Sequence, residues 1–132
     1  MKTLTKPNII SVIVFDYATI SLREDGIVNT DILISEPLSL EQAKELFNAY
    51  LEITNGKKVP HLFTVTKFAM IEKDVMEFIA EVGNKKGKAD AFVIHSLSQK
   101  ILGNFYLKFH KPSIPTKFFS SKEKAIEWLK SF

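Results

Sequence analysis

The chain has 132 residues, 45% of them hydrophobic and 25% charged, which is the composition of one ordinary globular domain. It contains no cysteine, which excludes a disulfide framework, a thiolate zinc site, an iron–sulfur cluster and a cysteine nucleophile. The net charge is +3, but the lysines are scattered over turns and helix positions. We therefore expect a solvated surface and no nucleic-acid partner, with a basic contact patch as the alternative.

The N-terminal segment begins with polar residues, and we expect residues 1–8 to be flexible. The apolar run Ile9 to Phe15 that follows is too short for a signal-peptide core with its usual flanks, and far too short to span a bilayer. These features predict a cytoplasmic, bacterial-type protein without membrane insertion.

The first predicted elements form a β-hairpin. Two runs rich in β-branched and apolar residues, Ala18 to Arg23 and Ile27 to Ile34, are separated by Glu24-Asp25-Gly26. Asp-Gly favours a tight turn between antiparallel strands because its residues tolerate positive φ. The run Ile9 to Phe15 is either an extension of this hairpin or an extra strand.

Helices and strands then alternate along the chain. Ser39 and Gln42 form a capping box before an amphipathic helix that ends at Asn55-Gly56, and a strand follows at Pro60 to Thr66. A second helical stripe consists of Ile71, Val75, Phe78, Ile79 and Val82, closed by Gly83-Asn84.

The C-terminal half repeats this alternation. Ala89 to His95 is nearly all apolar and predicts a buried central strand. A third helix is expected from about Ser98 to Phe109, with Gly103 as a weak point. Thr116 to Phe119 predicts a short strand, and Ser120 with Glu123 is expected to cap a last helix in which Trp128 is at least partly buried.

The predicted order is β-β-α-β-α-β-α-β-α, so the chain is expected to fold as one α/β domain over residues 1–132. The expected sheet has five strands and is mixed but mostly parallel. Because parallel crossovers are right-handed, sequential strands would place the four helices mainly on one face.

A candidate ligand site lies where two predicted parallel strands end. In open α/β sheets, ligands collect at the carboxyl ends of the strands. Thr66 and Lys67 lie at that end of one predicted strand, and His95, Ser96 and Ser98 lie at that end of the next. With two helix N-termini, these groups could hold an anion such as phosphate. The alternative is simple helix capping by Ser98, with His95 a strand-end residue.

Other chemistry is not marked in the sequence. The five glycines are isolated and form no phosphate-binding loop, and the three histidines lack metal-ligand spacing, so no cofactor or metal is expected. Nothing marks the orienting group or oxyanion hole that a serine nucleophile would need, so we expect no enzyme. The segment Lys111 to Lys117 is either a recognition loop or a rigid connector.

Three segments resemble a known family: the hairpin Ala18 to Ile27, the strand entry Asn55 to Pro60, and the tail Pro115 to Phe119 with Ala125 to Leu129. The resemblance covers about residues 12 to 132. It is to small bacterial STAS-like proteins with a SpoIIAA-like fold, similar to anti-sigma-factor antagonists. Those antagonists are switched by phosphorylation of a serine, but Val65 to Met70 holds no serine, so the switch is not expected here.

The resemblance and the missing catalytic motifs together favour a non-catalytic interaction or regulatory module. The alternative is a small-ligand protein that binds an anion at the strand ends or an apolar molecule against the sheet. We also expect a protein partner or a homodimer, with an uncovered sheet face or the N-terminal strand at its interface.

Overall fold

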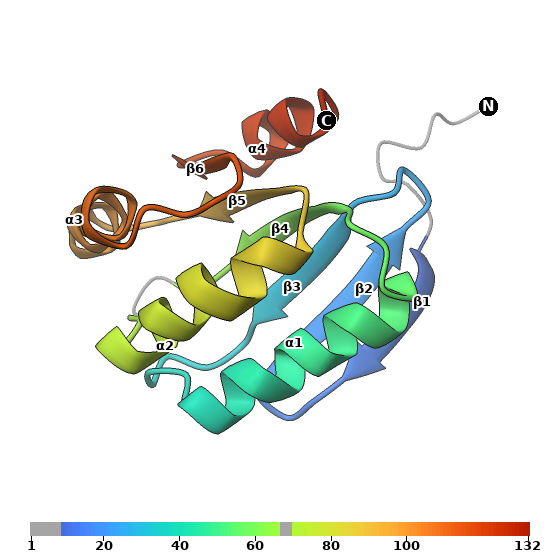
Figure 1. Ribbon diagram of the computed structural model, residues 1–132, viewed down its shortest axis with the longest axis horizontal. Helices are drawn as coiled ribbons and strands as arrows, with labels where there is room; N and C mark the ends of the chain where they lie inside the picture. Colours follow the sequence, from blue (N-terminus) through green and yellow to red (C-terminus); the bar gives the residue numbers. More distant parts are fainter. Residues whose placement is uncertain (1–8, 67–69) are drawn as a thin grey trace.

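The computed structural model describes residues 9–66 and 70–132, so the flexibility expected of residues 1–8 lies outside the described residues. Six strands form one sheet in the order β1-β2-β3-β4-β5-β6 (Figure 1). The strands are β1 (Ile9–Val14), β2 (Ala18–Arg23), β3 (Val28–Ile32), β4 (Pro60–Thr64), β5 (Ala89–Val93) and β6 (Thr116–Phe119). Pairing is antiparallel for β1–β2 and β2–β3, and parallel from β3 to β6.

The predicted hairpin joins β2 to β3. Gly26 adopts a φ of 86°, and the Asp25 carboxylate accepts hydrogen bonds from the Arg23 side chain and from the Ile27 amide. The run before the hairpin forms the separate strand β1, which pairs with β2 and makes the sheet six-stranded rather than five-stranded.

Four α-helices connect or follow the strands: α1 (Leu40–Thr54), α2 (Lys73–Phe78), α3 (Leu97–Phe105) and α4 (Lys122–Leu129). The capping box of α1 is present as predicted, but Ser96 caps α3 and Ser121 caps α4, each one or two residues from the predicted cap. Helix α2 continues as a π turn (Ile79–Gly83) and a 3₁₀ turn (Asn84–Lys86), and α3 continues as a π turn (Tyr106–His110).

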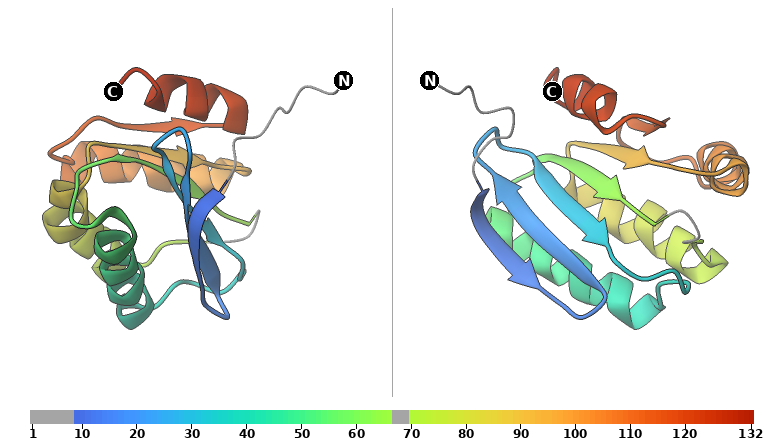
Figure 2. Two further views of the ribbon diagram at one scale, coloured as in Figure 1. Left: turned by 90° about the vertical axis from the view of Figure 1, so that its right-hand side faces the viewer. Right: turned by 180° about the vertical axis from the view of Figure 1, so that it is seen from behind.

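The helices cover both faces of the sheet (Figures 1 and 2). Helices α1, α2 and α3 belong to the crossovers between sequential parallel strands and lie on one face, as predicted. Helix α4 follows the last strand, is not a crossover, and returns over the opposite face of β4, β5 and β6. Three of the four helices thus lie on one face, as expected, and α4 covers part of the face that we expected to be uncovered.

A small core fills the space beneath α4. Ala125 and Leu129 are fully buried and pack on the side chains of Leu62, Ala91 and Val93. Trp128 is half-buried at the edge of this core, with its ring centroid 5.7 Å from that of Phe119 and 4.9 Å from that of Phe132. This confirms the predicted partial burial of Trp128.

The weak point expected at Gly103 is a close packing contact. A Cβ atom at this position would lie 2.9 Å from the Phe118 ring, nearer than van der Waals contact allows. We expect Gly103→Ala to lower the free energy of unfolding by about 1–3 kcal/mol, because the added methyl group overpacks the contact between α3 and β6. Urea unfolding of both proteins measures this, and a variant as stable as the wild type would show that α3 shifts without strain.

Candidate functional site

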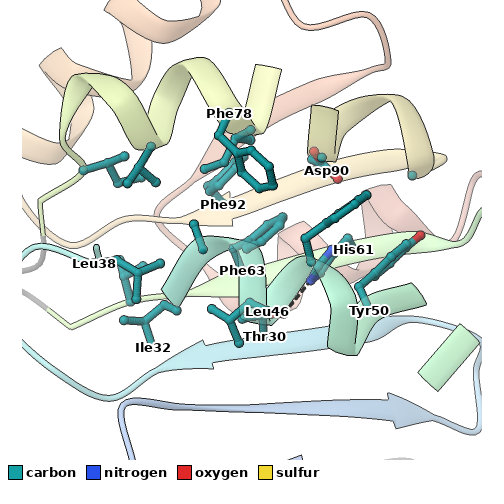
Figure 3. Close-up of a pocket in the computed structure, with 18 of the residues that line it drawn as sticks. Thr30, Ile32, Leu38, Leu46, Tyr50, His61, Phe63, Phe78, Asp90 and Phe92 are labelled. Carbon is teal, nitrogen blue, oxygen red and sulfur yellow. Dashed lines mark hydrogen bonds between the residues drawn. The ribbon is translucent and has the colours of Figure 1, made fainter. Parts of the chain in front are cut away.

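An apolar cavity of about 100 Å³ lies between the sheet and helices α1 and α2 (Figure 3). Its walls come from alternate residues of β3, β4 and β5, from the inner sides of the two helices, and from the segments that enter them. These residues include Thr30, Ile32, Leu38, Ala43, Leu46, Tyr50, His61, Phe63, Val65, Val75, Phe78, Asp90 and Phe92. The cavity therefore separates part of α2 from the sheet.

Stacked rings form the sheet side of this cavity. Residues 61, 63 and 92 point to the same face because side chains alternate along a strand and the register aligns Phe63 with Phe92. The ring centroids are 3.8 Å apart for His61 and Phe63, and 4.5 Å apart for Phe63 and Phe92. Tyr50 of α1 extends the stack at 4.9 Å from His61, and Phe118 extends it at 4.9 Å from Phe92.

A second cavity of about 50 Å³ adjoins the first on the α3 side of α2. Val65, Ile71, Ile79 and Phe92 line both cavities, and Leu102, Tyr106 and Phe118 line the second. Together the two spaces approach the size of a dry apolar cavity that binds benzene, roughly 150 Å³. The site as it stands therefore suits a molecule of about one ring.

His61 is a neutral group in the cavity wall. It is buried, and its Nε2 atom lies 2.6 Å from Thr30 Oγ1 in a hydrogen bond whose donor depends on the tautomer. Burial lowers the pKa of His61 to about 3, because the imidazolium would lose its hydration. His61 therefore carries no charge near neutral pH and serves as a hydrogen-bonding ring.

Asp90 lies beside His61 in the neighbouring strand and is 4% exposed. Burial raises its pKa to about 7, and the hydrogen bond that Asn84 Nδ2 donates to Asp90 Oδ2 over 3.0 Å acts in the opposite direction. The carboxyl group therefore changes charge near physiological pH, at the end of the cavity where β4 and β5 begin.

Asn84 holds the segment around Asp90 in place. It is 1% exposed, and its Oδ1 atom accepts hydrogen bonds from Ser113 N, Ser113 Oγ and Ile114 N at 2.7, 3.0 and 3.1 Å. Its amide group thus ties the end of α2 to β5 and to the loop before β6. This anchoring supports the rigid-connector interpretation of residues 111–117.

Tyr106 contributes a polar atom without a described partner. Its hydroxyl group is buried and forms no hydrogen bond within residues 9–66 and 70–132. Burial, and secondarily the charge of Asp90, raises the pKa of Tyr106 above its usual range, so the phenol stays protonated. A buried hydroxyl in this state has an unused capacity to donate.

The described residues proposed for an anion site lie at the other end of β5 from Asp90, and none of them lines either cavity. Thr66 Oγ1 donates to Ile34 O, and Ser96 Oγ accepts from Gln99 N as the cap of α3. His95 and Ser98 are exposed, and Lys67 lies outside the described residues. The buried side chain of Gln99, which the sequence analysis did not single out, accepts from His95 N and donates to Thr66 O.

His61 and Asp90 were not expected from the sequence to belong to one site. The available signal was a polar residue near the start of each of two apolar strands. Burying such a side chain costs free energy unless a hydrogen bond or a charge compensates it, so its presence there points to a role. Within the described parts of the chain, no three His, Asp or Glu side chains cluster so that they could hold a metal ion. Of the helices described, none is long and apolar enough to cross a membrane.

Comparison with known proteins identifies the family. The sequence pattern of DUF7793, a domain family of unknown function, matches residues 20–132. The chain belongs to this family. No curated protein matches the chain.

A solved structure shares the fold of this DUF7793 domain. It is an uncharacterized protein of the DUF3478 family from Shewanella loihica PV-4 with a SpoIIAA-like fold. The similarity has a TM-score of 0.56 at 15% identity and covers 98% of each chain. The fold is therefore SpoIIAA-like, as the resemblance in the sequence implied.

Proposed function

We propose that this protein is a non-catalytic regulatory domain that responds to a small, largely apolar ligand held in the cavity between the sheet and helices α1 and α2. The observation that carries the proposal is the apolar cavity, with stacked rings along its sheet side. The interiors of small domains are normally close-packed, so a cavity of this size favours a ligand site. The proposal places the domain in the cytoplasm of a bacterium, as its composition led us to expect.

The position of the cavity supports a regulatory role. Its walls include Ala43 and Leu46 of α1, Val75 and Phe78 of α2, and the ring of Phe63 on the sheet. A ligand in this space would contact all three elements at once, and its binding energy would favour one position of α2 over others. The surface of α2 would then report the ligand to a protein partner.

A variant that fills the cavity tests this proposal. Ala43 is buried and lines the cavity from α1, so Ala43→Leu places a larger apolar side chain in the ligand space. We expect its affinity for toluene, measured by titration calorimetry, to fall at least tenfold below that of the wild type. Lys44→Leu, at the adjacent exposed position, adds the same side chain outside the cavity and should bind as the wild type does. Equal toluene affinity in all three proteins would contradict the proposal.

We propose in addition that two copies pair through β1. This strand forms one edge of the sheet and contains no proline or charged residue over Ile9–Val14. Its side chains at Ile9, Ile10, Val12 and Val14 are 52–70% exposed, and nothing in its sequence protects the edge from pairing. A twofold antiparallel pairing would bring no like charges together. Because α4 covers the opposite face of β4, β5 and β6, it leaves less of that face free than we expected, which favours this strand of the two expected interfaces.

Light scattering tests the pairing. The wild type should have twice the 15.0 kDa mass of one chain at micromolar concentration. Val14→Lys should give the monomer, because a charge at the edge opposes strand pairing. Val82→Lys, at another exposed valine, should stay dimeric. A monomeric wild type would refute the pairing.

A further inference from the structure

Asp90 is a buried carboxyl group without a positive partner. It is 4% exposed, Asn84 occupies its Oδ2 atom, and no described residue bonds to its Oδ1 atom. The ion pair seen in the described parts of the chain joins Arg23 to Asp25, in the turn between β2 and β3. A buried carboxylate is costly unless a cation or several hydrogen bonds compensate it.

The groups that face Asp90 supply no such cation. His61 is its partner across the β4–β5 pairing and is kept neutral by burial. Burial, and to a smaller extent the nearby charge of Asp90, raises the pKa values of Tyr50 of α1 and of Tyr106 beyond α3, which keeps both phenols neutral. Asn84, at the end of α2, is uncharged. Every element around Asp90 therefore presents an uncharged group to it.

The space in front of this carboxyl group is bounded on the sheet side by stacked rings. Tyr50, His61, Phe63 and Phe92 form a continuous stack along the sheet side of the cavity that Asp90 also lines (Figure 3). The rings stack face to face and cover one another's faces, so they supply an apolar wall. An ammonium group donates three hydrogen bonds, of which the free Oδ1 atom of Asp90 can accept one. The carboxylate therefore favours an amine over a neutral molecule of the same size, and the rings provide an apolar wall for the body of that amine.

We propose that the ligand of this cavity is a primary amine with an apolar body of about one ring, and that the Asp90 carboxylate is its counter-ion. The inference rests on the proposed function, because it specifies the ligand of the same cavity. The amine would lie at the end of the cavity where β4 and β5 begin, and its ring would lie along the stack. Binding requires the ionised form of Asp90. Below about pH 7, formation of the complex with the ammonium ion therefore releases the carboxyl proton to the solvent.

Three probes of similar size test the inference: toluene, benzyl alcohol and benzylamine, titrated calorimetrically into the full chain at pH 6 and pH 8. We expect benzylamine to bind at least tenfold more tightly than toluene at pH 8, with a smaller advantage at pH 6, and benzyl alcohol to lie between them. Toluene binding equal to that of benzylamine would overturn the amine while leaving the apolar cavity intact. Failure of all three probes to bind would overturn the proposed function and the inference together.

Variants locate the effect. Asp90→Asn should reduce the ratio of benzylamine to toluene affinity to near one. Asp31→Asn removes a carboxylate from the opposite face of the sheet and should leave the ratio unchanged. If Asp90→Asn does not fold, the ¹³C resonance of the Asp90 carboxyl group in the wild type gives the answer: saturating benzylamine should lower its titration midpoint by at least one pH unit. An unmoved midpoint, or an unchanged ratio in a folded Asp90→Asn variant, would refute the counter-ion.

Discussion

Replacing Asp90 with asparagine is expected to stabilise the ligand-free protein increasingly as the pH rises. Burial raises the pKa of Asp90 from its ordinary value of 3.8 to about 7 in the folded chain. A carboxyl group with a raised folded pKa contributes stability that is fully present below its unfolded pKa and is lost as pH rises through its folded pKa. Asparagine is uncharged at every pH and keeps an oxygen that can accept from Asn84, so the variant avoids this loss.

The size of this effect follows from the two pKa values. Between pH 5 and pH 8.5, the difference in unfolding free energy between Asp90→Asn and the wild type should grow by about 3 kcal/mol in favour of the variant. Urea unfolding at both pH values measures this difference. His61 has the opposite linkage, since its lowered pKa makes stability fall as pH drops from about 6.5 towards 3, but it is present in both proteins and cancels.

Asp31→Asn serves as the matched control, because Asp31 is half-buried on the opposite face of the sheet and accepts a hydrogen bond from Thr64. Its difference from the wild type should stay constant between the two pH values. A constant difference for Asp90→Asn as well would mean that Asp90 titrates like an exposed carboxyl group, which contradicts a buried carboxyl without a cationic partner.

Replacing Asn84 with alanine is expected to cost about 3–4 kcal/mol of unfolding free energy. The change removes the acceptor of three hydrogen bonds from Ser113 and Ile114 and the donor to Asp90. Each buried group left unsatisfied costs about 1–3 kcal/mol, and the loop recovers part of this by turning its amides to water. Because Asp90 also loses its one described side-chain partner, the loss should be larger at pH 8.5 than at pH 5.

Asn48→Ala is the control for this variant, since Asn48 is exposed on α1. It should change stability by less than about 0.5 kcal/mol, because alanine favours the helix and no buried contact is lost. If Asn84→Ala cost no more than Asn48→Ala, the amide of Asn84 would not be what joins α2, β5 and the loop before β6.

Most of the fold was predictable because local signals coincide with it. The capping box at Ser39, the Asp25-Gly26 turn and the alternation of helices with apolar strands each agree with the structure. The face occupied by α4 was not predictable from the crossover rule, because that rule constrains a helix only when a parallel strand follows it. The π turns after α2 and α3 also have no signal in the periodicity of their apolar residues.

The candidate site was harder to predict, since it depends on strand register. Residues 61, 63, 90 and 92 come together because β4 and β5 align His61 with Asp90 and Phe63 with Phe92, and no single segment contains that alignment. The sequence analysis instead placed the site at the carboxyl ends of the strands, where Ser96 and Thr66 form hydrogen bonds within the protein. The other ligand it allowed, an apolar molecule against the sheet, stays a prediction, and the cavity is the place where such a molecule would lie.

The most direct test of a ligand site between the sheet and helices α1 and α2 is a ¹H–¹⁵N NMR titration of the wild type with toluene. Toluene in the cavity should cause saturable shifts of the amide signals of β4, β5, α1 and α2, around Phe63, Val75 and Phe92. Helix α3 and the π turn after it present an exposed apolar stripe at Leu97, Ile101, Phe105 and Phe109 that offers toluene an alternative place to bind. Shifts confined to that stripe, or no saturable shifts at all, would contradict the account.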